Sequence, residues 1–81
     1  MRQLISTPRQ VGEILRGRRR SRRVPQRELA AKLGVSQGRF STLEADPSRL
    51  TLGRLIALAK LLGLDLVLED RSDTRSQPGE W

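Results

Sequence analysis

The chain has 81 residues, enough for one small domain whose core alone is marginally stabilising, so we expect a second subunit to contribute. Sixteen Lys and Arg against nine Asp and Glu give a net charge of +7, and the excess lies in residues 1–40, which favours a polyanionic partner such as nucleic acid. The lack of Cys and His excludes disulfides and most transition-metal sites and removes the usual groups of acid–base catalysis, so we expect no enzyme, cofactor or metal.

Neither a membrane segment nor a signal peptide is predicted. The longest mostly apolar run, residues 52–68, is interrupted by Arg54, Lys60 and Asp65. The N-terminus lacks the succession of charged region, apolar block and cleavage site that marks a signal peptide. We therefore expect a cytoplasmic protein with no membrane partner, and a nucleic-acid partner would place it at the nucleoid.

The first predicted helix begins with a capping box. Thr7 is its N-cap, Pro8 takes the first helical position, and Gln10 can return a hydrogen bond to the cap. A second helix is predicted for residues 26–33, and Gly34 ends it by supplying a left-handed residue. Its apolar residues fall on one face, as expected for a helix packed on a core: Leu29, Ala30 and Leu33.

The third predicted helix follows after only two residues. Ser36 caps this segment, residues 37–45, which directs Phe40 and Leu43 inward. Because so short a turn joins them, the second and third helices must cross steeply.

A fourth helix is predicted from the cap Thr51 to about Leu62, and it carries two apolar stripes. One stripe suits the domain core: Leu52, Leu55, Ile56, Ala59 and Leu62. Leu58 and Leu61 lie to its side. Two interpretations fit these two leucines, since they either widen the core face or form a dimer contact that a monomer would leave exposed.

Residues 64–69 alternate well enough to predict one β-strand, with Asp65 toward solvent and with Leu64, Leu66 and Leu68 over the helices. Within the chain only residues 3–5 could pair with it. A lone strand is not stable, so we expect it to pair with its own copy across a two-fold axis. The expected organisation is a mainly all-α DNA-binding and dimerisation domain, residues 1–69, followed by a polar, disordered tail, residues 70–81.

A helix, a two-residue turn and a capped helix together form a helix-turn-helix, whose second helix enters the major groove N-terminus first. The residues expected to read bases are Ser36, Gln37, Gly38, Ser41 and Thr42. The Gln37 amide can donate and accept together, as adenine requires. Gly38 costs about 1 kcal/mol of helix propensity relative to Ala, which fits a site where a side chain would collide with a base. Alternatively, both residues are simply exposed at a helix start.

The densest charge is "RGRRRSRR", residues 16–23. A run of this kind is usually a solvated surface, but its predicted place beside the third helix favours contact with phosphates. The expected phosphate contacts are Arg20, Arg22, Arg23, Arg39 and Gln26. Arg19 follows Leu15 by one turn on the inward side, so we expect it to pair with Glu44.

The segment "PQRELAAKLGVSQGRFSTLEAD" resembles the central motif of the Cro/C1-type (XRE) helix-turn-helix family of phage repressors. The resemblance implies phosphate contact by Gln26, base contact around Gln37 and a bridge between Arg19 and Glu44. Pro25 stands where the family usually has a Thr or Ser cap, so the capping of the second helix departs from the family pattern.

Nearly the whole chain is similar to HipB-type antitoxins, through "STP", four helices, "TLGRLIALAKLLGLDLVLED" and a polar tail closing on Trp81. This similarity implies a homodimer whose terminal strands pair into a lid. It also implies that the homodimer binds double-stranded DNA to repress its own operon and binds a HipA-type Ser/Thr kinase toxin. Trp81 is then a candidate anchor for the partner, or else an incidental residue. The alternatives are a stand-alone repressor with no toxin and a protein-binding inhibitor whose DNA motif is vestigial.

Overall fold

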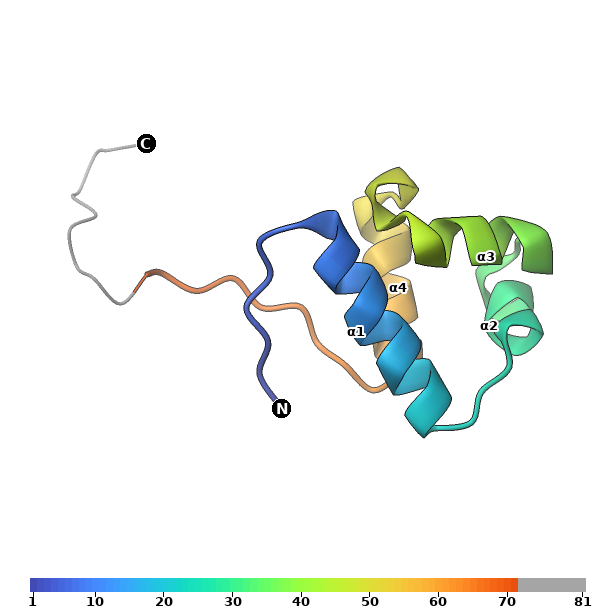
Figure 1. The fold of residues 1–81 in the computed structure, drawn as a ribbon, viewed down its shortest axis with the longest axis horizontal. Coiled ribbons are helices and arrows are strands. Elements are labelled where there is room, and N and C mark those ends of the chain that lie inside the picture. Colours follow the sequence, from blue (N-terminus) through green and yellow to red (C-terminus); the bar gives the residue numbers. More distant parts are fainter. Residues whose placement is uncertain (72–81) are drawn as a thin grey trace.

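Four α-helices and one 3-10 helix build the domain in the computed structural model, which describes residues 1–71 (Figure 1). They are α1 (Pro8–Ser21), α2 (Gln26–Leu33), α3 (Gln37–Ala45), η1 (Pro47–Arg49) and α4 (Leu52–Leu61). No helix in this part of the chain combines the length and the apolar character needed to cross a membrane. The predicted four-helix architecture is confirmed.

The helix ends follow the capping residues in the sequence. Thr7 accepts a hydrogen bond from the backbone N–H of Gln10, whose side chain accepts one from the Thr7 N–H at 3.0 Å, so the predicted capping box is present. Ser36 and Thr51 each accept the backbone N–H of the third residue of their helices. Pro25 precedes α2 and gives it no side-chain cap.

The core lies where α1, α2, α3 and α4 converge. Phe40 of α3 is 1% exposed and packs in a cluster to which every α-helix contributes: Leu15, Leu29, Ala30, Phe40, Leu58 and Leu62. Partly buried residues, among them Val24 and Val35 in the connections, surround this cluster. The inward positions predicted for α2 and α3 are therefore confirmed.

The prediction for the apolar faces of α4 is partly wrong. Leu58, expected beside the core, is 2% exposed and belongs to it, whereas Leu52 and Ile56 of the predicted core stripe are exposed. The buried face consists of positions i, i+3, i+4 and i+7, which are Leu55, Leu58, Ala59 and Leu62. This face is rotated from the predicted one, so Leu52 and Ile56 lie at its edge. Leu61 remains exposed, as one interpretation required.

Residues 64–71 leave the domain as an extended segment and form no strand in this single chain. The backbone N–H of Leu64 donates to the Ala59 carbonyl at 2.8 Å, and Leu64 packs against the core. The prediction that Leu66 and Leu68 also cover the helices is wrong here, because both are exposed. Gly63, with φ 74°, turns the chain away from the helices, and no strand within the described residues holds the segment against them.

The N-terminal segment, residues 1–6, crosses this C-terminal segment in the view of Figure 1, and an ion pair between Arg2 and Glu69 joins the two. Trp81, with the rest of the predicted tail from residue 72 on, lies outside the described residues.

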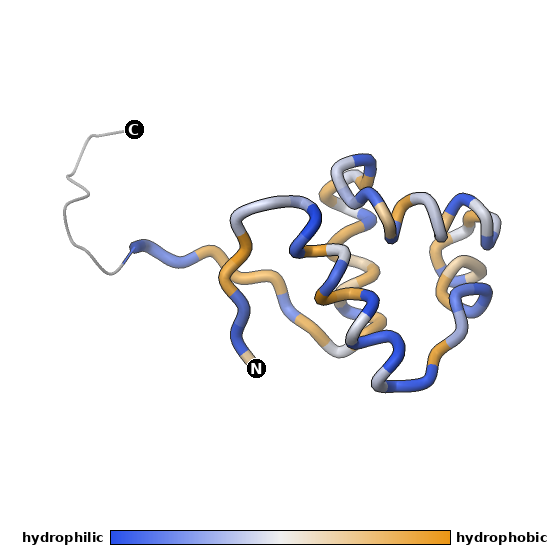
Figure 2. Tube along the Cα trace, in the orientation of Figure 1, coloured by the Kyte–Doolittle hydropathy of each residue, from blue (hydrophilic) through white to orange (hydrophobic). Residues whose placement is uncertain are grey.

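Among residues 1–71, large apolar side chains are exposed on one part of the molecule. The large exposed apolar residues of the described chain lie on α4 and the two terminal segments: Met1, Leu4, Ile5, Leu52, Ile56, Leu61, Leu66, Val67 and Leu68. Figure 2 shows the contrast between these apolar stretches and the hydrophilic connection from α1 to α2. The surface of α2 and α3 is thus polar, and the opposite part is not.

Candidate nucleic-acid interface

The turn between α2 and α3 has the geometry that the sequence predicted. Gly34 adopts a left-handed conformation with φ 74° and ψ 29°. This lets the Val35 N–H donate to the Ala30 carbonyl at 3.0 Å, after which Ser36 begins the cap of α3. The two helices are thereby joined by two residues and packed against each other, as a helix-turn-helix requires.

One side of α3 is free for an external ligand. The five residues predicted to read bases, Ser36, Gln37, Gly38, Ser41 and Thr42, are all exposed. The other side of the helix is buried through Phe40, Leu43 and Glu44. The structure therefore brings the predicted base-reading residues together on one polar surface.

These residues differ in how many hydrogen-bonding groups they leave free. The Ser36 hydroxyl accepts from the Arg39 N–H at 3.0 Å, and the Thr42 hydroxyl donates to the Gly38 carbonyl at 3.2 Å. Within residues 1–71 the side chains of Gln37 and Ser41 have no hydrogen-bond partner. Gln37 and Ser41 thus keep their full donor and acceptor capacity for a ligand.

Gly38 is not required by the internal packing of the domain. A Cβ built at this position would meet no atom of the described chain within 4 Å, and the backbone there is not left-handed. An alanine would fit and would favour the helix by about 1 kcal/mol. The packing of the described chain therefore gives no reason for glycine at this position.

The predicted ion pair between Arg19 and Glu44 is present and bidentate. Arg19 Nε donates to Glu44 Oε2 at 2.8 Å, and Arg19 Nη2 donates to Oε1 at 3.1 Å. Glu44 is only 2% exposed, so this pair is buried. Arg16, one turn before Arg19, is a second cation, with its Nε 3.6 Å from Oε1. Arg16 was not predicted to join this pair, although its spacing from Arg19 places it on the same side of α1.

Burial of the Glu44 carboxylate raises its pKa, but this effect is outweighed. Hydrogen bonds from Arg19 and Gln26, with the charges of Arg19 and Arg16, hold the pKa of Glu44 below its ordinary value of 4.5. Glu44 is therefore ionised at neutral pH, although it is buried.

A glycine permits this cluster to form. A Cβ on Gly12 of α1 would lie 2.7 Å from the Glu44 carbonyl oxygen and 2.9 Å from Cγ of Pro47. Any larger residue at this position would push α1 away from the end of α3, where the two arginines reach Glu44. The role of Gly12 was not predicted from the sequence, because a close approach between helices leaves no periodic signal.

Gln26 is the first residue of α2, and its side chain is partly engaged within the protein. Its Nε2 donates to Glu44 Oε1 at 2.9 Å, a contact that the sequence did not predict. One N–H of the amide is left, along with backbone N–H groups at the start of α2 that no side chain caps. Gln26 can still contact a phosphate, but from a fixed position.

The arginines predicted to contact phosphates fall into two groups. Arg20, Arg23 and Arg39 are exposed. Arg22 is exposed too, but its guanidinium lies at the C-terminal end of α4, where a Cβ on Gly63 would be 2.8 Å from Nη2. Arg18 is held there as well, since its Nε donates to the Leu62 carbonyl at 3.0 Å.

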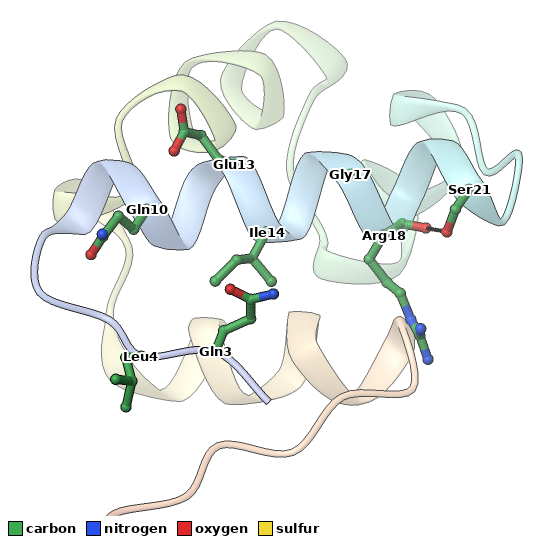
Figure 3. A pocket seen from close by; sticks show the side chains of 8 residues that line it. All are labelled: Gln3, Leu4, Gln10, Glu13, Ile14, Gly17, Arg18 and Ser21. Carbon is green, nitrogen blue, oxygen red and sulfur yellow. Dashed lines mark hydrogen bonds between the residues drawn. The ribbon is translucent and has the colours of Figure 1, made fainter. Parts of the chain in front are cut away.

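Two open hollows lie outside this surface. One, of about 480 Å³, lies between residues 3–4 and the outer side of α1, where Ile14 and Gln3 face each other (Figure 3). The other, of about 450 Å³, lies where the N-terminal segment, the start of α1, η1 and the start of α4 meet. Neither is lined by a residue of α2 or α3, so neither is part of the nucleic-acid interface.

Comparison with known proteins agrees with this geometry. A family model described as helix-turn-helix matches residues 15–68, which is more than half of the chain and includes α2, α3 and α4. No curated protein matches the chain. The two-residue turn, the polar side of α3 and the match together show that this chain belongs to the Cro/C1-type helix-turn-helix family of DNA-binding regulators.

Proposed function

We propose that the chain is a homodimeric transcriptional repressor that reads an inverted-repeat operator with α3. The observation that carries this proposal is the set of free polar groups on the N-terminal half of α3, centred on Gln37 and Ser41. Gly38 supports it, because the domain's own packing does not require a glycine there, whereas a surface that approaches closely from outside would. A base edge or a thymine methyl in the major groove is such a surface.

Phosphate contacts flank the reading helix. Arg20, Arg23, Arg39 and Gln26 supply affinity without sequence preference, and Arg22 supplies less because it lies beside Gly63. Replacing Arg23 with alanine is expected to weaken every duplex similarly and to lower the log–log salt slope by about one unit. Titrations at several salt concentrations measure the slope, and an unchanged slope removes Arg23 from the phosphate contacts.

The dimer is proposed to form on the opposite part of the molecule. Exposed Leu61, Leu66 and Leu68 lie there, while Leu64 extends the core toward them. The backbone of the C-terminal segment has no ladder partner within residues 1–71, so pairing with the same segment of a second copy would satisfy it. Leu58 is dropped from the proposed interface because it is part of the core.

Substitutions at alternating positions test this dimer. Leu66→Asp with Leu68→Asp places two carboxylates on one side of the proposed strand and is expected to yield monomers in sedimentation analysis. Val67→Asp is the matched control, because Val67 points to the other side of such a strand. An unchanged dimer in the double variant, or equal dissociation in both, contradicts the two-fold strand pairing.

We further propose that this repressor is the antitoxin of a HipA-type Ser/Thr kinase toxin and represses its own operon. The support is the similarity of nearly the whole chain to HipB-type antitoxins and the exposed apolar part, which lies away from α3. Trp81 is the proposed anchor for the kinase.

Co-purification from the native host at low salt tests the antitoxin role, with the full chain beside a variant in which Trp81 is replaced by alanine. A stoichiometric partner of kinase size, lost with the variant, is the expected result. If no partner appears with either chain, the alternative of a stand-alone Cro/C1-type repressor holds.

A further inference from the structure

Glu44 joins three helices of the DNA-binding half. It lies near the end of α3, its oxygens accept hydrogen bonds from Arg19 of α1 and from Gln26 of α2, and Arg16 of α1 adds a second positive charge. The exposed fractions of the side chains are 2% for Glu44, 11% for Arg19 and 40% for Arg16. The cluster is thus largely shielded from water, where hydrogen bonds to a charged group are strong.

The same cluster fixes the start of α2 on α1. Arg19 Nη1 donates to the Val24 carbonyl at 3.1 Å, and the Val24 N–H donates to the Arg19 carbonyl at 3.0 Å. Val24 is therefore tied to Arg19 at both of its backbone groups, two residues before Gln26. The position of the Gln26 backbone is set by α1, and that of its side chain is set by Glu44 of α3.

The chemistry of Glu44 also determines which way the Gln26 amide faces. An ionised carboxylate has only acceptors, so it repels the amide oxygen and holds the amide nitrogen. The second N–H on that nitrogen is then the group left for an external acceptor. A free glutamine would rotate about three side-chain bonds and would lose this freedom on binding.

From this geometry we propose that Glu44 is a positioning residue for DNA recognition, which acts through Gln26. It fixes the position of the Gln26 side-chain amide relative to α3. The phosphate contact of Gln26 and the base contacts of Gln37 then form together in one placement of the protein on the duplex. The inference rests on the proposed function, since it requires Gln26 to contact a phosphate. Its consequence is that loss of Glu44 harms discrimination between sequences more than it harms general affinity for DNA.

A double-mutant cycle tests the inference. The binding constants of wild type, Glu44→Gln, Gln26→Ala and the double variant are measured on a duplex selected by the wild type from a random pool and on a scrambled duplex of equal length. Glu44→Gln is expected to lower the ratio of selected to scrambled affinity by about tenfold, and to leave that ratio unchanged in the Gln26→Ala background. Arg16→Gln is the matched control: it removes a partner of Glu44 but not the Gln26 hydrogen bond, so the ratio should stay within about twofold.

Equal fold losses on both duplexes, or additive effects in the cycle, would show that Glu44 is merely structural and overturn the inference alone. A wild type with no preference for any duplex would overturn the proposed function as well.

NMR relaxation of the Gln26 side-chain amide in the free wild type is a second test, and it does not depend on whether a variant folds. An order parameter near that of rigid backbone, about 0.85, is expected, and a value below about 0.6 overturns the inference.

Discussion

The DNA-binding half, α1 to α3, differs from the other half, α4 with the two terminal segments. The two halves differ in how far one chain buries their apolar side chains and pairs their polar groups. In the first, the apolar side chains are buried, the one buried carboxylate has three partners, and the exposed residues are polar. In the second, large apolar side chains are exposed and an extended backbone segment has no ladder partner among the described residues. The first half buries its apolar side chains within one chain, whereas the second leaves apolar side chains exposed, which the proposed dimer would cover.

This difference agrees with the two interfaces that we propose for one small domain. A polar surface with free hydrogen-bonding groups stays hydrated until a charged polymer with matching groups approaches, so α3 needs no cover in the free protein. An exposed apolar patch is unfavourable in water and marks a contact with another macromolecule. The distribution of exposed side chains thus separates the polar surface of α3 from the proposed subunit contact.

The largest expected effect distinguishes the two halves by stability. Phe40→Ala removes a side chain that is 1% exposed from the core and should lower the free energy of unfolding by about 3–5 kcal/mol. Leu68→Ala, at a fully exposed position, should not change the unfolding of the monomer. Chemical denaturation at low protein concentration measures both free energies of unfolding. A large loss of unfolding free energy for Leu68→Ala would mean that the monomer itself buries the apolar side chains of the second half.

A second prediction concerns the reading surface. Gln37→Ala should cost about 1–3 kcal/mol of binding free energy on the selected duplex and relax the preference at one base pair. The free protein should unfold as before, because the Gln37 side chain has no hydrogen-bond partner within residues 1–71. Binding to a set of single-base variants of the duplex gives the comparison. Equal losses on every duplex would remove Gln37 from the base contacts.

The pH dependence of stability should reside in the first half. Because the folded pKa of Glu44 lies below its ordinary value of 4.5, the ionised form stabilises the fold above that pH. This contribution is lost as the pH falls below 4.5, through the lowered folded pKa. Unfolding measured from pH 7 to pH 3 should show a decline at the acid end that is weaker in Glu44→Gln. An identical decline in the variant would assign it to other carboxylates.

The smallest effect is expected where the two terminal segments meet. The ion pair between Arg2 and Glu69 is exposed, so Arg2→Ala should change the free energy of unfolding of the monomer by about 0–1 kcal/mol. Thermal unfolding of the two proteins side by side measures the difference. A loss above this range would show that the terminal segments are fixed on the domain without a second subunit.

The sequence predicted the first half well because its signals are local. Caps at Thr7 and Ser36, the left-handed Gly34 and the apolar spacing of α2 each act within one turn of the helix that they define. The pairing of Arg19 with Glu44 was also predictable, since both positions face inward. The contact of Gln26 with Glu44 and the close approach at Gly12 were not, because both depend on how α1, α2 and α3 meet in space.

The second half was harder to predict for a physical reason. The fourth helix is apolar around much of its circumference, so periodicity alone could not decide whether Leu58 or Ile56 faces the core. The packing of α4 on the other helices decides it. The alternation in residues 64–69 indicated a strand, but a strand forms only beside a second strand, and residues 1–71 of a single chain do not provide one.

Selection of duplexes from a random pool by the wild-type chain reports base reading by α3 and the two-fold pairing in one result. We expect an enriched inverted repeat with its half-sites one helical turn apart, about 34 Å between the two copies of α3. A single half-site without a repeat would contradict the dimer, and a pool without any enriched sequence would contradict the reading of bases by α3.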